Sequence, residues 1–219
     1  MSFKGEIDAN CPNGCEAFAA EVWSFIHGER SPELRDALLW RECNLIICPG
    51  CGAAFVPEAA FVYLEAGAEL LAFVFPASYR DREDYWRGKM RDDFSAMKRT
   101  LGGELESIEE PELFFGQEGL GELLQREDYR GEESEVMEHV ARELGLGLYA
   151  VSRAYARRHE VPRALPYVQR PGRKPGVEAV VEGLRRVVEA NERLSDCRSF
   201  LAKLERGCPL PPERAAKPA

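Results

Sequence analysis

Along the first 78 residues, hydrophobic and polar positions alternate in short stretches that are typical of β-strands. Residues 18–26 are apolar on much of both faces, which predicts a strand buried on both sides. Ser31, Pro32 and Glu33 supply an N-cap, a first-turn proline and an acidic first turn, so a short helix is expected to begin there and to end near Trp40. Further strands are predicted at 43–47, 61–65 and 70–75, the last two joined as a hairpin. The pattern therefore predicts a small antiparallel sheet with one helix.

From residue 79 onward the apolar spacing becomes helical. Helices are predicted at 80–101, at 113–124 with an interruption by two glycines, at 132–144 and at 177–205. Prolines mixed with basic residues predict an irregular connector over 160–176, because proline disrupts a helix interior. The composition changes near Pro76, which marks the predicted domain boundary. The expected fold class is α+β, with an N-terminal module at 1–78 and a mainly helical domain at 79–219.

The composition is that of a globular protein. Of 219 residues, 45% are hydrophobic and 31% charged, which permits a sizeable core and excludes disordered and fibrous classes. No apolar run approaches the roughly 20 residues that cross a bilayer, and residues 1–6 lack the pattern of a signal peptide. A cytoplasmic protein without a membrane segment is expected. In that reducing compartment, seven cysteines indicate metal ligation with spare thiols rather than disulfides.

Four of the seven cysteines form two close pairs, Cys11 with Cys15 and Cys48 with Cys51. Two such pairs, separated by a few tens of residues, bring four thiolates to one tetrahedral metal ion. One zinc ion per chain is expected, with iron in the same cage as the less favoured alternative. Four protein ligands leave no open position for substrate, so the metal is predicted to be structural and not catalytic. The other cysteines are predicted not to be ligands, namely Cys43, Cys197 and Cys208.

Further residues around these cysteines carry a family resemblance. They are Pro12, Val22, Trp23, the helix start at 31–34, Asn44, Leu45, Pro49, Gly52 and the segment 73–76. With the four cysteines, they make the first 75 or so residues resemble the CpXC domain family, small bacterial and archaeal modules named for two Cys-Pro-x-Cys motifs. The first motif carries one residue more than the family spacing, which Gly14 is expected to absorb in a wider loop. The resemblance implies a zinc-ribbon-like fold and a metal-binding role without established enzymatic activity, and it does not reach residues 80–219.

The net charge of −9 is unevenly distributed. Residues 1–78 carry −7, which suits a phosphate backbone poorly, whereas residues 147–219 carry +7. The basic segment suits nucleic acid, an acidic partner, or the chain's own acidic middle at 102–146. A protein partner is expected, which the sequence does not identify.

Residues 136–158 indicate a rival function, because their pattern resembles a helix-turn-helix. In that interpretation the chain is a DNA-binding regulator, and the side chains that face the groove are Tyr149, Ser152, Arg153 and Arg157. The alternative is a helix that ends at Gly145, followed by a strand over 146–151, with Arg157 and Arg158 on the solvated surface. The closely spaced glycines and the preceding acidic residues favour this alternative.

Residues 177–205 also fit a heptad repeat, through which two copies would pair as a homodimer. Because Arg198 breaks the repeat, packing of this helix within the chain is favoured. No local motif indicates a catalytic residue or an organic cofactor site, and an enzyme with a pocket between the two domains is the second alternative. The sequence therefore favours a non-catalytic, zinc-binding interaction or scaffold protein.

Overall fold

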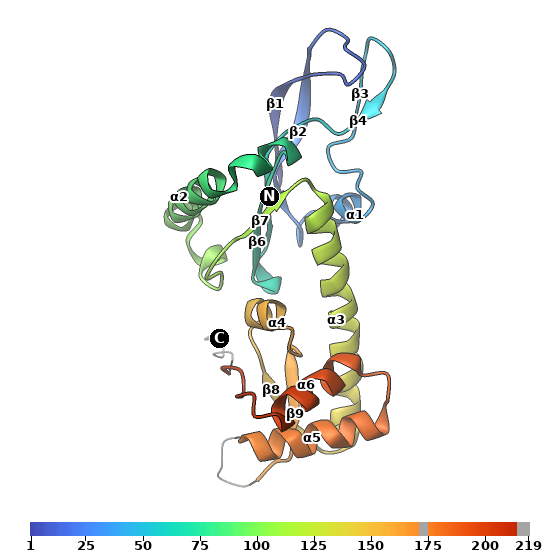
Figure 1. Cartoon of the computed structure of the whole chain (residues 1–219), viewed down its shortest axis with the longest axis vertical. Coiled ribbons are helices and arrows are strands. Elements are labelled where there is room, and N and C mark those ends of the chain that lie inside the picture. Colours follow the sequence, from blue (N-terminus) through green and yellow to red (C-terminus); the bar gives the residue numbers. More distant parts are fainter. Residues whose placement is uncertain (171–174, 214–219) are drawn as a thin grey trace. The chain divides into compact units, whose positions relative to one another are not determined.

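The structure is a computed structural model that describes residues 1–170 and 175–213. Residues 171–174 of the predicted connector and 214–219 of the proline-rich tail lie outside this part. The chain divides into two compact units, unit 1 at Met1–Gln125 and unit 2 at Arg126–Ala219 (Figure 1). A sheet in the N-terminal part is followed by helices, so the predicted α+β class is confirmed. In the described ranges, no helix combines the length and the apolar character needed to cross a membrane.

Unit 1 is built around a five-stranded sheet in the order β1-β2-β5-β6-β7. Its strands are β1 (Phe3–Ala9), β2 (Phe18–His27), β5 (Phe61–Glu65), β6 (Leu70–Phe75) and β7 (Glu112–Phe115). The pair β5–β6 is the predicted antiparallel hairpin; β1, which the sequence pattern did not predict, pairs antiparallel with β2, whereas β2–β5 and β6–β7 are parallel. The sheet is therefore mixed and larger than the expected antiparallel one.

The long connections explain the parallel pairs, because a parallel neighbour needs a crossover of a dozen or more residues. Between β2 and β5 the chain forms α1 (Pro32–Leu39) and a separate two-stranded ribbon of β3 (Ile46–Ile47) and β4 (Ala54–Phe55). Between β6 and β7 it forms α2 (Glu83–Leu101). Three short 3₁₀ helices complete unit 1, η1 (Ala66–Ala68), η2 (Ala77–Arg82) and η3 (Gly102–Leu105).

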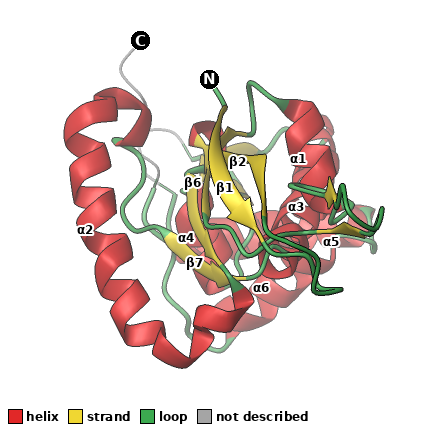
Figure 2. Ribbon diagram, turned by 90° about the horizontal axis from the view of Figure 1, so that it is seen from above, coloured by secondary structure: helices red, strands yellow, loops and turns green. Residues whose placement is uncertain are grey.

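Helices cover both faces of this sheet (Figure 2). One face packs against Leu38 of α1 and Leu120 of α3 (Glu118–Glu143). The other face packs against Met90 and Phe94 of α2. Because β7 is the last strand of this sheet and α2 covers one of its faces, unit 1 continues past residue 78, where the sequence composition changes, to Gln125.

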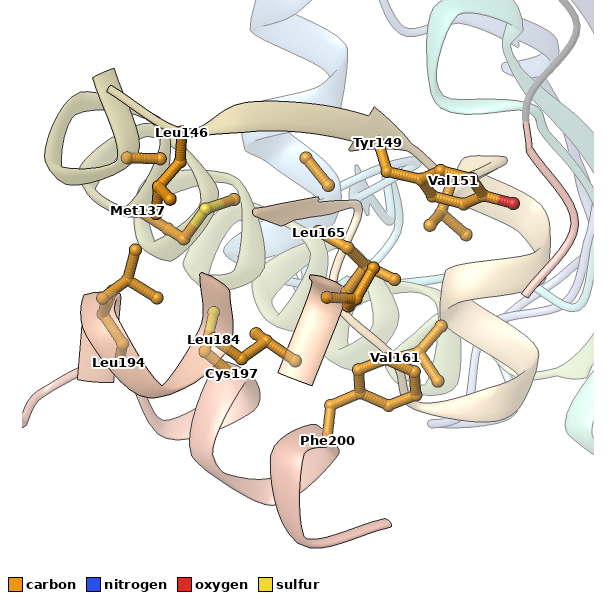
Figure 3. Packing of buried hydrophobic residues seen from close by; sticks show 14 of the residues in the cluster. Met137, Leu146, Tyr149, Val151, Val161, Leu165, Leu184, Leu194, Cys197 and Phe200 are labelled. Carbon is orange, nitrogen blue, oxygen red and sulfur yellow. The ribbon is translucent and has the colours of Figure 1, made fainter. Parts of the chain in front are cut away.

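Unit 2 contains a two-stranded antiparallel sheet, β8 (Gly147–Ala150) with β9 (Ala164–Tyr167). Around it lie the end of α3, α4 (Arg153–His159), α5 (Val177–Ala190) and α6 (Ser195–Glu205). The shared core includes Leu165, Leu184, Cys197 and Phe200, all buried (Figure 3). A Cβ at Gly183 of α5 would lie 2.4 Å from the carbonyl oxygen of Pro166. The backbones of α5 and β9 are therefore in direct contact at this point, which only a glycine permits.

The single helix predicted over 177–205 is wrong. The chain leaves the helix at Asn191, whose backbone is extended, and α6 begins at Ser195. The break lets α6 fold back onto α5, so that Val187, Leu194 and Phe200 share one core. Most of the apolar stripe that suggested a homodimer, namely Val180, Leu184, Val187 and Leu194, is therefore buried within unit 2.

Candidate metal centre

Each close pair of cysteines lies on a short turn, here called a knuckle. The first knuckle carries Cys11 and Cys15 and follows β1. After Ala9 the chain turns through Cys11, Asn13 and Gly14, and the backbone N–H of Gly14 donates to the carbonyl oxygen of Cys11 at 3.0 Å. Gly14 adopts φ +76°, a left-handed conformation that glycine accepts without strain. The extra residue of this motif is thus absorbed at Gly14, and Cys15 is placed just before β2.

The second knuckle is the turn between β3 and β4. Ile46 pairs with Phe55 and Ile47 with Ala54, which brings the chain into a tight loop. Within the loop the N–H of Cys48 donates to the carbonyl of Ala53, and the N–H of Gly52 donates to the carbonyl of Cys48, both at 2.9 Å. Gly52 has φ +73°, so here too a glycine makes the turn.

The two knuckles converge on one point. The Sγ atoms of Cys11, Cys15, Cys48 and Cys51 all lie within 4.8 Å of one another. A Cβ on Gly50 would be 3.5 Å from the Sγ of Cys15, so the knuckles approach each other closely. Cys11 and Cys48 are buried, whereas Cys51 is exposed at the rim. The structure therefore brings together all four cysteines that the sequence analysis identified as candidate metal ligands.

The other cysteines lie elsewhere. Cys43 is buried in the core of unit 1 and Cys197 in the core of unit 2. Cys208 is exposed after α6. None of the three belongs to the four-cysteine group, which is the one group of potential metal ligands found in the described ranges.

The thiols of Cys11, Cys15 and Cys51 differ in pKa. The backbone N–H of Ala53, and then the side chain of Asn13, lower the pKa of Cys51 to about 6. Hydrogen bonding to Cys51 raises the pKa of Cys15 to about 12, and burial raises the pKa of Cys11. A thiolate at Cys51 thus lies beside the protonated thiols of Cys11 and Cys15, and binding of a metal by the sulfurs would release protons from these two residues.

Two asparagines position the site, and sequence reasoning did not assign them this role. The Nδ2 of Asn13 donates to the Sγ of Cys51 at 3.5 Å. Asn44 has φ +60°, accepts from the N–H of Trp23 at 2.7 Å and donates to its carbonyl at 3.0 Å. Asn44 thereby ties the ribbon to β2. The nearest signal in the sequence is their position: Asn13 lies between Cys11 and Cys15, and Asn44 lies shortly before Cys48.

The helix-turn-helix prediction for 136–158 is wrong. α3 ends at Glu143, and the next segment is β8, because its backbone pairs with β9. Tyr149 is buried there and its hydroxyl donates to the carbonyl of Pro211 at 2.7 Å. Arg157 has a side chain only 7% exposed, and its guanidinium lies 3.3 Å from the carboxylate of Glu127. Tyr149 and Arg157 are therefore not available to a DNA groove. The alternative of a strand after Gly145 is confirmed, whereas its placement of Arg157 in solvent is wrong.

Comparison with known proteins agrees with this geometry. The family model described as CpXC protein matches residues 9–123, which include both cysteine pairs, strands β2 to β7 and the first turns of α3. The expectation that the resemblance ends before residue 80 is therefore wrong. No curated protein and no solved structure matches the chain.

Proposed function

The chain belongs to the CpXC family, and we propose that it is a zinc-binding interaction protein whose metal ion is structural. The observation that carries this proposal is the convergence of four cysteine sulfurs from two knuckles. Zinc–sulfur bonds of about 2.3 Å in a tetrahedron place neighbouring sulfurs about 3.8 Å apart. The Sγ atoms of Cys11 and Cys51 are already 3.6 Å apart, so small adjustments of the knuckles suffice.

Zinc fits this donor set better than other common metals. Thiolates exclude the hard cations magnesium and calcium, which prefer oxygen ligands. Iron accepts the same cage, and zinc is the proposed ion because four cysteines on two knuckles are typical of structural zinc sites. A colourless protein with one zinc ion per chain is the expected result.

The metal ion would hold the two knuckles together. β3 and β4 have two residues each, which is too little backbone pairing to hold the ribbon alone. Four protein ligands also fill the tetrahedral ion and leave no position for water or substrate. The ion would therefore stabilise a surface, and interaction through that surface is the proposed role.

Elemental analysis of the purified chain and two cysteine variants tests the metal site. Cys51→Ser is expected to lose most of the zinc and to lower the stability of unit 1. Cys208→Ser is the matched control, because Cys208 is also exposed but lies outside the group. Cys197 would be a poor control, since it is buried in the core of unit 2. Equal zinc content in both variants would contradict the assignment.

A further inference from the structure

The β3–β4 ribbon presents one apolar side to solvent. Burial alternates along both strands, and the inner side carries Ile46 and Phe55, which are half-buried. Phe55 contacts Phe18 edge to face, with ring centroids 6.4 Å apart. The outer side, the ribbon face, consists of Leu45, Ile47, Ala54 and Val56, all exposed and the isoleucine 68% exposed.

The four side chains of the ribbon face are neighbours. The pairing puts Ile47 opposite Ala54, and Leu45 and Val56 directly adjoin the other paired residues, Ile46 and Phe55, at the end of the ribbon. Directly opposed residues have Cβ atoms roughly 4.5–5.5 Å apart. The ribbon face is thus one continuous apolar surface, and such surfaces mark interaction sites more often than scattered exposed residues do.

The ribbon face is held at both ends. At one end Asn44 makes two hydrogen bonds to the backbone of Trp23 in β2. At the other end lie Cys48 and Cys51, and this step rests on the proposed function, since the metal would fix their loop. Binding of a partner therefore costs little conformational entropy, because the ribbon is already ordered.

Charge around the ribbon favours a cationic partner. The two segments that carry the knuckles, residues 4–24 and 41–58, hold six exposed carboxylates against Lys4 and Arg41, a net charge of −4. A zinc ion with four thiolates would make this region more negative by two further charges. Such a surface repels phosphate and attracts lysine and arginine.

We propose that the ribbon face docks an extended segment of another protein, in which alternating apolar residues lie between lysines or arginines. In the described part of the chain, no third strand pairs with β3 or β4. An added strand can hydrogen-bond to one of these edges. Every second side chain of that strand then lies on the same side of the sheet as the ribbon face and packs beside it, and its basic flanks meet the carboxylates.

A labelled peptide tests the proposal with the full chain in its zinc-loaded form. The probe is an extended nine-residue peptide with a valine and isoleucine centre and two lysines at each end, and its match carries glutamates instead of lysines. Fluorescence anisotropy is expected to show at least tenfold tighter binding of the lysine peptide. Ile47→Glu should weaken that binding at least tenfold. Leu148→Glu should leave it unchanged, because Leu148 is an exposed residue of the other two-stranded sheet.

Each other outcome counts against the proposal. Equal binding to Ile47→Glu and to the unaltered chain would place the peptide elsewhere, and a preference for the glutamate peptide would contradict the charge argument. Sedimentation that shows a dimer lost in Ile47→Glu would assign the ribbon face to a second copy instead. Zinc is measured in every sample, so a zinc-loaded chain that binds no peptide overturns the docking alone, whereas a chain without zinc overturns the metal site.

Discussion

Gly28 lies against the phenol ring of Tyr63. A Cβ at this position would be 2.1 Å from the Oη of Tyr63 and 2.6 Å from its Cζ. Tyr63 is fully buried, and its hydroxyl donates to Glu65 at 2.6 Å, so the ring cannot shift without loss of that hydrogen bond. We predict that Gly28→Ala lowers the free energy of unfolding of unit 1 by about 2 kcal/mol, within the range for overpacking. Urea unfolding followed by tryptophan fluorescence measures the change.

Gly88 provides the control for this substitution. It lies exposed within α2, and no atom outside its own helix lies within 4 Å of the position of its Cβ. Because alanine favours a helix over glycine, Gly88→Ala should raise stability by about 0.5–1 kcal/mol. A rise in both variants would show that Tyr63 does not constrain residue 28.

At the scale of single residues, the sequence predicts those roles that depend on short local motifs. The four cysteines of the proposed site were identifiable because each pair is local and thiolates have few metal-binding arrangements. The roles of Gly28 and Asn44 were not, since they depend on Tyr63 and Trp23, which are distant in sequence. Such pairs arise only when strands come together.

Within unit 2, one buried carboxylate joins three elements. Glu127 of α3 lies 3.3 Å from Arg157 of α4 and 3.0 Å from Arg163, which precedes β9. The three side chains are 7%, 7% and 14% exposed. We predict that Glu127→Gln destabilises unit 2 by about 3 kcal/mol, because two buried guanidinium groups lose the charge between them. Urea unfolding followed by far-UV circular dichroism measures this effect.

Glu182 is the matched control for Glu127. It pairs with Arg186 on the surface of α5 and is 41% exposed. Exposed pairs contribute little, so Glu182→Gln should change stability by less than about 0.5 kcal/mol. A similar, small effect in both variants would mean that the buried carboxylate is not needed to hold α3 and α4 together.

At the scale of elements, long periodic segments were predicted and short strands were not. The hairpin of β5 and β6 and helix α2 carry enough repeats of their pattern to be recognised. The four residues of β7 look like the start of a helix, because their partner β6 lies far back in the sequence. β9 contains Pro166, which a two-stranded sheet tolerates because one edge of each strand is open.

Over the whole molecule, each unit has its own core and its own optical signal. Unit 1 has two hydrophobic clusters on the faces of its sheet, and unit 2 has one around β8 and β9. All three tryptophans lie in unit 1, at Trp23, Trp40 and Trp86. Tryptophan fluorescence therefore reports on unit 1, whereas circular dichroism also reports on the helices of unit 2.

Removal of the proposed metal should consequently act on one unit. A ligand that binds only the folded state stabilises it in proportion to the logarithm of its concentration over its Kd. We predict that a zinc chelator lowers the urea midpoint seen by tryptophan fluorescence and leaves the transition of unit 2, followed by circular dichroism, unchanged. In Cys51→Ser the chelator should have no effect, because the site is already lost. If both transitions shift together, the units unfold as one, and if neither shifts, the four cysteines hold no stabilising metal.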